Sequence, residues 1–169
     1  MRSTALYFGS FNPVHYGHLA IAQYALTLPE IDEVWLVLSP QSPLKSENLL
    51  WDEQKRLQLL QTALIAIENI RICTIELEMS RPSYTIDTLN SLQMQYPEKT
   101  FVILMGADNL EHFEQWKSYK TILDTYRIYV YPRAGVVQNT LFEHPHICYL
   151  ADAPLLPVSS TELRASIEN

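Results

Sequence analysis

Ten residues near the N-terminus carry the side chains with the clearest chemical purpose. Residues 9–18 read Gly-Ser-Phe-Asn-Pro-Val-His-Tyr-Gly-His and directly follow the apolar run Ala5–Phe8. A strand that ends in glycine and leads into a helix is a common phosphate site, because backbone N–H groups and the helix N-terminus face the anion. His15 and His18 are three residues apart, so on a first helical turn they project from the same side. Their imidazoles could donate hydrogen bonds to phosphoryl oxygens.

The spacing of these two histidines is also compatible with metal ligation, or with two ordinary surface side chains. The sequence shows no cluster of cysteine and histidine that would complete a zinc site. Cys73 and Cys148 lie in apolar runs and are expected to be buried strand residues. These residues alone leave the alternatives open, and the family resemblance given next is what favours phosphate binding by His15 and His18.

A second polar motif near the C-terminus, taken with the first, resembles the nucleotidyltransferase superfamily of adenylyltransferases. That family carries a glycine-rich turn ending in His-x-Gly-His, found here at residues 15–18, and Ser-Ser-Thr-x-Leu/Ile-Arg, found here at residues 159–164. Further segments are similar to the bacterial nicotinate mononucleotide adenylyltransferase branch: Ser-Tyr-Thr-Ile-Asp-Thr-Leu at 83–89, Gly-Ala-Asp-Asn-Leu at 106–110, and then Phe113 and Trp116. The resemblance covers residues 1–169 as a single domain.

The resemblance implies one reaction, transfer of the AMP moiety of ATP to nicotinate mononucleotide in NAD biosynthesis. The products are nicotinate adenine dinucleotide and pyrophosphate. The mononucleotide phosphate attacks the α-phosphorus of ATP in line, without a covalent enzyme intermediate. Catalysis then consists of positioning and of charge stabilisation on the transferring group. Mg²⁺ is expected as a cofactor, bound mainly through the ATP phosphates and water.

The resemblance also assigns the residues that meet ATP. His15, His18 and Lys45 are expected to be catalytic, although Lys45 could equally be a solvated loop lysine. Asp108 could also act as a helix N-cap. Ser159 and Glu162 have the spacing of a capping box, which alone predicts only a helix start. The expected ATP-binding residues are Gly9, Ser10, Phe11, His15, His18, Gly106, Asp108, Ser159, Ser160, Thr161 and Arg164.

A second set of residues is expected to bind the mononucleotide. The indole face of Trp116 would stack on the pyridine ring, although its spacing from Phe113 also suits a core position. Backbone N–H groups of Thr85 and Lys117 would hold the nicotinate carboxylate, whereas a carboxamide would present its own N–H groups to them. The full set implied by the resemblance is Asn12, Lys45, Tyr84, Thr85, Trp116 and Lys117.

Three features depart from the family pattern. Asn12 stands where the family usually has Asp. Residues 42–45 read Ser-Pro-Leu-Lys where relatives have Pro-Pro-His-Lys, so Leu44 lacks a histidine contact. The chain ends at Asn169, soon after Arg164, so the C-terminal helix is expected to be short; either the tail is absent or the sequence is shortened.

Three alternative functions follow from the same motifs. Phosphopantetheine adenylyltransferase shares the ATP motifs, but residues 83–89 and Trp116 favour the nicotinate branch. A nicotinamide-preferring homologue is separated only by resemblance. A catalytically silent nucleotide-binding module is disfavoured by the intact His15, His18 and Arg164.

Composition limits the partners of the chain. The 169 residues suggest one domain with a sizeable core, and the net charge of −7 disfavours nonspecific binding of nucleic acid. No apolar stretch approaches the ~20 residues of a membrane span, and no signal peptide is evident. Two distant cysteines fit a reducing cytoplasm. ATP and nicotinate mononucleotide are thus the expected partners, and the sequence leaves open whether the chain forms a homo-oligomer.

The alternation of short apolar runs with helical patterns predicts a Rossmann-like, doubly wound parallel sheet with helices on both faces. The expected strands are Ala5–Phe8, Val34–Leu38, Ile70–Ile75, Phe101–Met105 and Arg127–Tyr131. The expected helices are Leu19–Leu28, Glu53–Ile67 with Asp52 as its N-cap, Ile86–Gln95 and Thr121–Thr125, and residues 39–48 and 132–145 are expected to be mobile loops. Gly9, Ser39, Gly106 and Pro132 end or follow expected strands, so the motifs should meet at the carboxyl edge of the sheet.

Overall fold

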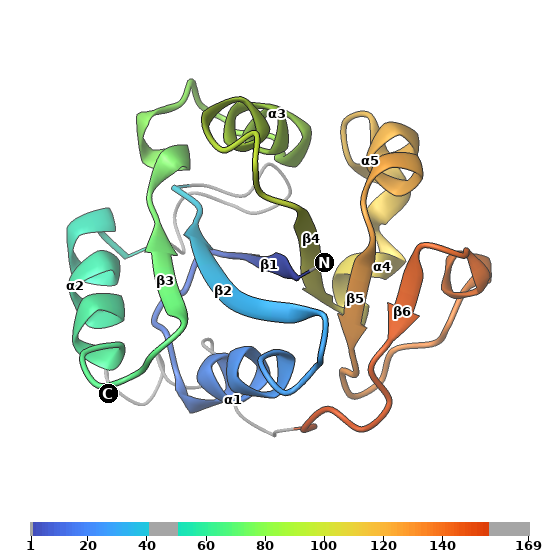
Figure 1. The fold of residues 1–169 in the computed structure, drawn as a ribbon, viewed down its shortest axis with the longest axis horizontal. Coiled ribbons are helices and arrows are strands. Elements are labelled where there is room, and N and C mark those ends of the chain that lie inside the picture. Colours follow the sequence, from blue (N-terminus) through green and yellow to red (C-terminus); the bar gives the residue numbers. More distant parts are fainter. Residues whose placement is uncertain (1, 41–50, 156–169) are drawn as a thin grey trace.

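The strands of the computed structural model, which describes residues 2–40 and 51–155, form one sheet. In this part of the chain, six parallel strands are ordered β3-β2-β1-β4-β5-β6 (Figure 1). They are β1 (Ser3–Gly9), β2 (Ile31–Leu38), β3 (Ile70–Cys73), β4 (Phe101–Gly106), β5 (Ile128–Tyr131) and β6 (Ile147–Tyr149). This arrangement confirms the expected doubly wound α/β fold.

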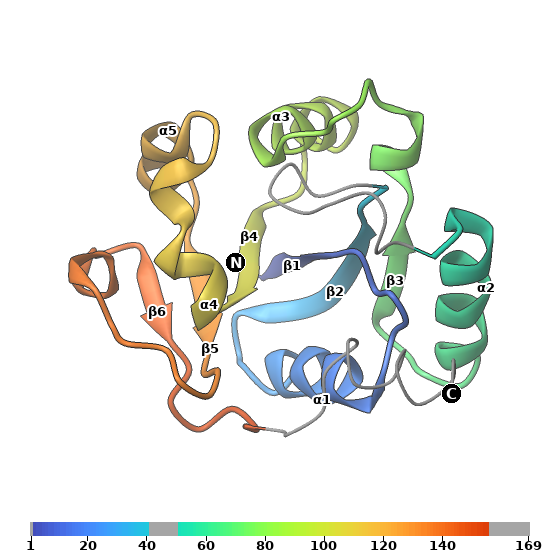
Figure 2. The same ribbon diagram turned by 180° about the vertical axis from the view of Figure 1, so that it is seen from behind.

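The helices cover both faces of the sheet, as Figures 1 and 2 show. The α-helices are α1 (Tyr16–Ala25), α2 (Glu53–Ala63), α3 (Thr85–Gln95), α4 (Ala107–Glu111) and α5 (Tyr119–Thr125). Short 3₁₀ segments are η2 (Ile75–Glu78), η3 (Phe113–Gln115) and η4 (Thr140–Glu143). Among the described helices, none is both long and apolar enough to cross a membrane.

Two hydrophobic cores lie on opposite faces of the sheet because strand side chains alternate in direction. On β2, Leu36 and Leu38 join the core beneath α1 and α2, whereas Trp35 and Val37 join the core beneath α3, α4 and α5. The inner parts of the strands, such as Val34–Leu38 of β2 and Phe101–Met105 of β4, are therefore continuous apolar runs, as expected for a parallel sheet covered on both sides. The helix residues that fill these cores include Ile21, Ala22 and Leu60 on one face and Leu89, Leu92, Leu110 and Ile122 on the other.

Several element boundaries differ from the sequence prediction. Helix α1 begins at Tyr16, three residues earlier than expected, because the side chain of His15 caps it. Helix α2 begins after the expected N-cap Asp52, whose side chain accepts from the N–H of Gln54, but it ends at Ala63 instead of Ile67. Strand β3 ends at Cys73 because the next residues turn into η2.

The smallest strand, β6, was not predicted as an element, although Cys148 was expected to be a buried strand residue. Cys148 does lie in β6, but it is only half-buried because this strand forms the edge of the sheet. Cys73 is buried in β3 as expected, and both cysteines are free thiols. The expected loop 132–145 includes the 3₁₀ segment η4.

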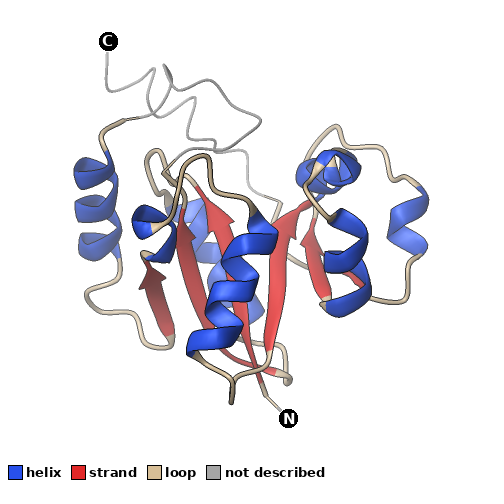
Figure 3. Ribbon diagram, turned by 90° about the horizontal axis from the view of Figure 1, so that it is seen from above, coloured by secondary structure: helices blue, strands red, loops and turns tan. Residues whose placement is uncertain are grey.

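The strand order reverses between β1 and β4, which places a switch point at the centre of the sheet. Ligands of such sheets bind outside the carboxyl ends of the strands at this point. The strands β1 and β4 end at Gly9 and Gly106, and β2 and β5 end at Leu38 and Tyr131. Among the described residues, Gly9, Ser39, Gly106 and Pro132 lie at the carboxyl ends of the strands as expected, and Figure 3 shows the helices flanking the strands.

Candidate active site

The turn after β1 has an unusual backbone that is fixed by a buried ring. Phe11 has a φ of 45°, in the left-handed region, and the peptide bond between Asn12 and Pro13 is cis. The Phe11 side chain is only 2% exposed, and it lies so close to Gly9 that a Cβ there would be 3.1 Å from the ring. A left-handed non-glycine residue costs about 1–3 kcal/mol. Burial of the aromatic ring offsets that cost and anchors the turn.

His15 and His18 form a reciprocal capping box at the start of α1. The Nδ1 atom of His15 accepts from the backbone N–H groups of Gly17 at 3.1 Å and His18 at 3.3 Å. The Nδ1 atom of His18 in turn accepts from the N–H of His15 at 3.1 Å. Ser and Glu usually make this motif, so the two histidines occupy roles that the sequence pattern did not reveal.

These hydrogen bonds determine the tautomer of both imidazoles. A ring nitrogen that accepts a hydrogen bond carries no proton, so the proton of each ring belongs on Nε2. Burial and, as the smaller cause, the nearby Arg133 guanidinium together lower the pKa of His15 to about 4. His15 is thus neutral at physiological pH. Each histidine is arranged to donate from Nε2.

Aromatic rings support the His18 imidazole. The Phe11 and Tyr7 rings meet it edge to face, with centroids 5.0 and 6.1 Å away. The Tyr7 hydroxyl donates to the Tyr131 hydroxyl at 3.1 Å, which joins the ends of β1 and β5 beneath the site. Burial raises the pKa of both phenols, so they remain neutral hydrogen-bonding groups. His18 therefore has a defined orientation before any ligand binds.

On the other side of the switch point, Asp108 and Arg133 form an ion pair. Arg133 Nε lies 3.8 Å from Asp108 Oδ1, and both side chains are partly exposed. Asp108 lies in the first turn of α4, but the N-cap is Gly106, so the alternative of Asp108 as N-cap was wrong. A side chain at Gly106 would collide with Asp108, which explains the glycine at the strand end.

Arg133 is a functional candidate that the sequence analysis missed. It contributes to the low pKa of His15, so its positive charge is near enough to that imidazole to disfavour protonation. Its position directly after Pro132, at the end of β5, was the available signal. A cation at this edge supplies the local positive charge that a chain of net charge −7 needs to meet a phosphate.

The predicted mononucleotide residues form a second group at the start of α3. Tyr84 is the N-cap, Thr85 is the first helical residue, and no side chain caps the helix. Lys117, which follows η3 in the chain, contacts this helix start. Its Nζ lies 3.2 Å from Asp87 Oδ2 and 4.9 Å from the centroid of the Tyr84 ring. Sequence segments 83–89 and 116–117 are therefore neighbours in space, as the expected carboxylate site requires.

Trp116 is both a core and a surface side chain. It is half-buried against Phe113, with ring centroids 5.1 Å apart and a tilt of 53°. Phe113 is fully buried and supports it. The two interpretations of Trp116 from the sequence are thus compatible, because one part of the indole packs on the core while another part is accessible.

Asn12 is a buried residue of the turn after β1. It is 3% exposed, and its Oδ1 accepts from the Trp51 backbone N–H at 2.8 Å. The side chain braces the turn against the start of α2, and its expected contact with the mononucleotide stays a prediction. An Asn suits this contact because its amide oxygen is an uncharged acceptor.

The family assignment follows from similarity over nearly the whole chain. Residues 6–166 match the family described as Cytidylyltransferase-like. A probable nicotinate-nucleotide adenylyltransferase of Azobacteroides pseudotrichonymphae is 45% identical over 159 residues, 94% of this chain and 83% of the relative. A second, from Flavobacterium johnsoniae, is 41% identical over 96% of this chain and 85% of the relative. The chain belongs to the nicotinate-nucleotide adenylyltransferase family.

Solved structures support the fold of this family member. The nicotinic acid mononucleotide adenylyltransferase of Plasmodium falciparum, complexed with NaAD, has a TM-score of 0.80 and 19% sequence identity, covering 98% of this chain and 83% of that one. A Vibrio parahaemolyticus structure, described as a putative nicotinate-nucleotide adenylyltransferase, has a TM-score of 0.71 and 19% identity over 99% of this chain and 88% of that one. At this identity the likeness concerns the arrangement of the sheet and helices.

Some predicted site residues of this adenylyltransferase-family chain lie outside the described ranges. They are Lys45, Ser159, Ser160, Thr161 and Arg164. Within residues 2–40 and 51–155, no group of three or more His, Cys, Asp or Glu side chains is placed to hold a metal ion. The described residues brought together at the carboxyl edge are Gly9, Ser10, Phe11, His15, His18, Gly106 and Asp108 on one side and Tyr84, Thr85, Trp116 and Lys117 on the other.

Proposed function

We propose that this chain transfers the AMP moiety of ATP to nicotinate mononucleotide and releases pyrophosphate. The observation that carries the proposal is the histidine pair at the switch point, whose capping box fixes both Nε2 atoms as proton donors. Such fixed donors suit a phosphoryl group whose negative charge increases in the transition state. The names of relatives at 37–45% identity support the choice of acceptor.

The chemistry requires only positioning and charge stabilisation from the protein. His15 and His18 would donate from Nε2 to oxygens of the α-phosphoryl group while the mononucleotide phosphate attacks in line. The bond from the α-phosphorus to the bridging oxygen breaks, and pyrophosphate leaves with that electron pair. Arg133, beside the pair, would add a positive charge near the phosphates. Correct orientation of two bound reactants can supply about 7–11 kcal/mol of barrier lowering.

The nicotinate group would lie between α3 and η3. The first N–H groups of a helix have no intrahelical acceptor, and α3 starts without a side-chain cap, so the N–H of Thr85 can meet a carboxylate. The N–H of Lys117 would be the second donor. The exposed part of the Trp116 indole would stack on the pyridine ring.

We assign the remaining expected groups to the same reaction. Mg²⁺ would enter with ATP and be held by phosphate oxygens and water, because the described residues lack a protein cage for it. Lys45 and residues 159–164 would contact the ATP phosphates, as the resemblance implies. The free thiols of Cys73 and Cys148 fit a cytoplasmic protein.

Pyrophosphate release tests this function directly. The enzyme is incubated with ATP and Mg²⁺ and, separately, with nicotinate mononucleotide, nicotinamide mononucleotide or phosphopantetheine. Strong release with nicotinate mononucleotide alone is the expected result. Release with phosphopantetheine only would move the chain to coenzyme A biosynthesis, and preference for nicotinamide mononucleotide would contradict the carboxylate site. No release with any acceptor would favour a nucleotide-binding module.

A further inference from the structure

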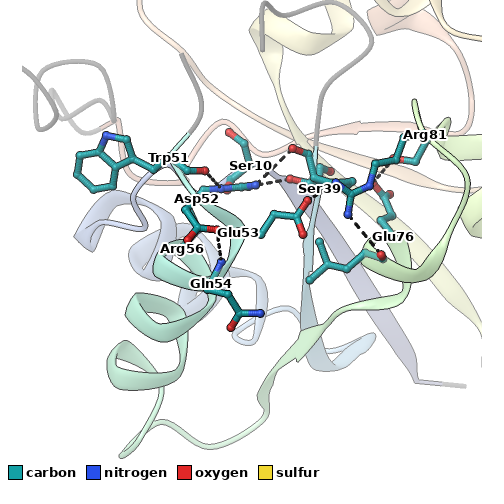
Figure 4. A network of polar contacts seen from close by, with 12 residues as sticks. Ser10, Ser39, Trp51, Asp52, Glu53, Gln54, Arg56, Glu76 and Arg81 are labelled. Atoms are coloured by element: carbon teal, nitrogen blue, oxygen red, sulfur yellow. Dashed lines mark hydrogen bonds and ion pairs between the residues drawn. The ribbon is translucent and has the colours of Figure 1, made fainter. Parts of the chain in front are cut away.

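A buried arginine joins three segments of the chain near the phosphate turn. Arg56, on α2, is 1% exposed. Its Nη1 donates to the carbonyl oxygens of Ser10 and Ser39, both at 2.8 Å, as Figure 4 shows. Its Nε donates to the Trp51 carbonyl at 2.9 Å and its Nη2 to the Pro40 carbonyl at 3.3 Å. The guanidinium thus binds the turn after β1, the end of β2 and the approach to α2.

Burial of this cation has a cost that points to a positioning role. Removing a guanidinium from water is unfavourable unless its donors find partners, and here the partners are backbone carbonyls. Asp52 and Glu53 provide negative charge nearby, which partly compensates for the burial that lowers the pKa of Arg56. A backbone carbonyl position depends on the path of the chain, so the arginine fixes that path.

A second buried charged residue, a glutamate, holds the segment at the start of α3, where the mononucleotide is proposed to bind. Glu76, on η2, is 3% exposed. Its two carboxylate oxygens accept from the hydroxyls of Ser83 at 2.9 Å and Thr88 at 3.0 Å. Ser83 directly precedes Tyr84 and Thr85, and Thr88 lies on the first turns of α3. The carboxylate therefore holds the helix N-terminus that was assigned to the nicotinate group.

Ser39 links the two buried charges. Its carbonyl accepts from Arg56 Nη1 at 2.8 Å, and its hydroxyl lies near enough to the Glu76 carboxylate to lower the pKa of that group, against the larger effect of burial, which raises it. Figure 4 shows Ser39 between these side chains. Polar contacts thus run from Ser10 in the phosphate turn through Arg56, Ser39 and Glu76 to Ser83 beside α3.

We propose that Arg56, Ser39 and Glu76 form a positioning bridge that holds the phosphate turn and the N-terminus of α3 in register for reaction. The proposal rests on the proposed function, because it assigns the two ends of the bridge to the two substrates. Polar networks of this kind act as units, so a change at one end alters the geometry at the other. In this proposal, Arg56, Ser39 and Glu76 do not touch the reacting atoms.

The first test separates mononucleotide binding from general damage. Glu76→Gln removes the charge that both hydroxyls meet, and we expect the KM for nicotinate mononucleotide to rise at least about tenfold, as loss of charge-assisted hydrogen bonds implies. The KM for ATP should rise by less than about threefold, because the change reaches the histidine turn only through Ser39 and Arg56. Equal changes in both KM values, or none, would overturn the proposal.

A matched control lies at the opposite edge of the sheet. Glu33 is also a partly buried carboxylate, accepting from Thr4 Oγ1 at 3.0 Å and Lys99 Nζ at 2.6 Å near the start of β1. Glu33→Gln should lower the melting temperature without changing either KM. Should Glu76→Gln fail to fold, Thr88→Val removes one of the same hydroxyl donors with little change of volume and should give the same selective rise in KM.

A double-mutant cycle tests whether the bridge acts as one unit. Arg56→Lys keeps the charge but loses the forked donors, and Glu76→Gln is combined with it. If Ser39 transmits the effect, the double variant should lose less kcat/KM than the product of the two single losses. Independent, multiplicative losses would show two separate structural residues and contradict the bridge.

Amide hydrogen exchange keeps the proposal testable apart from turnover. In Glu76→Gln, exchange should accelerate at residues 83–86 and also at residues 9–12, but not in Glu33→Gln. Unchanged exchange at residues 9–12 would overturn the bridge even if the enzyme is active. If the wild type shows no turnover with any acceptor, the proposed function fails, while the exchange result still decides on the bridge.

Discussion

The imidazole rings of His15 and His18 stack with their centroids 3.7 Å apart and their planes 21° from parallel. Stacking at this distance suits two neutral rings and is unfavourable for two cations. The two side chains that cap α1 are also the ones proposed to bind the phosphoryl group, so local folding and the proposed function depend on the same residues at this turn.

Replacement of His18 by alanine should abolish turnover but leave ATP binding measurable. Loss of one fixed donor to the transition state typically costs about 10²–10³ in kcat. Loss of its Nδ1 acceptor also opens the capping box, which should cost about 0.5–2 kcal/mol of stability. Steady-state kinetics and calorimetric titration with ATP check both parts. Gln23→Ala, an exposed change on the same helix, is the control, and unaffected turnover in His18→Ala would contradict the assignment.

Arg133 should be detectable through the ionisation of His15. Arg133→Gln removes a positive charge that disfavours the imidazolium, so the pKa of His15 should rise from about 4. It should remain below the ordinary value of 6.5, because burial is the larger cause and is unchanged. NMR titration of the imidazole protons measures the shift. Arg71→Gln, at an exposed position, should leave the value unchanged.

The low pKa of His15 predicts a specific pH dependence of stability. In the unfolded chain this imidazole protonates near pH 6.5, whereas in the folded chain it resists protonation until about pH 4. The unfolded state therefore binds more protons in this window, and the free energy of unfolding should fall as the pH drops from 6.5 toward 4. In His15→Asn, which retains a cap acceptor, that fall should be smaller in chemical denaturation at several pH values. Parallel curves for the two proteins would refute the assigned pKa.

Two glycines at this edge should respond differently to alanine. At Gly106 a Cβ would lie 2.5 Å from Asp108 Oδ1 and 3.0 Å from the Tyr131 ring, so Gly106→Ala should displace Asp108 and weaken nucleotide binding. Its cost in stability should be about 1–3 kcal/mol, as for other overpacked sites. Gly135 has open space but a φ of 78°, so Gly135→Ala should cost about 1 kcal/mol through strain alone. Thermal unfolding and ATP titration separate the two mechanisms.

The sequence was sufficient for the fold because periodicity and turn chemistry agree along the chain. The apolar strands and the glycines at their carboxyl ends predicted the sheet and the edge where the site lies. The weakest element, β6, is a three-residue edge strand and is too short to give a period. The end of α2 was missed because the helical pattern continues to Ile67, whereas Leu64 already closes the helix and Asn69 adopts a φ of 66°.

The sequence pointed to the two histidines of the candidate site but not to the buried residues that hold the surrounding segments in position. Arg56 has the sequence appearance of a surface helix residue, and only the three-dimensional path of three segments makes it a buried donor. Glu76 was likewise indistinguishable from the exposed acidic residues around it. Asn12 was assigned to substrate by resemblance, and its contact with the Trp51 backbone was not predicted. Contacts between distant segments have no signature in one sequence, and these residues depend on such contacts.

The close approach of the Phe11 ring to Gly9 links the evolutionary choices at two positions. With Phe at 11, a methyl group at 9 would be 3.1 Å from the ring, so the mutation Gly9→Ala is expected to be harmful on this background. In a variant with a smaller side chain at position 11, the methyl group added by Gly9→Ala would no longer meet the ring. The two positions should therefore show epistasis, and a combinatorial library for this turn must vary them together to find the functional combinations.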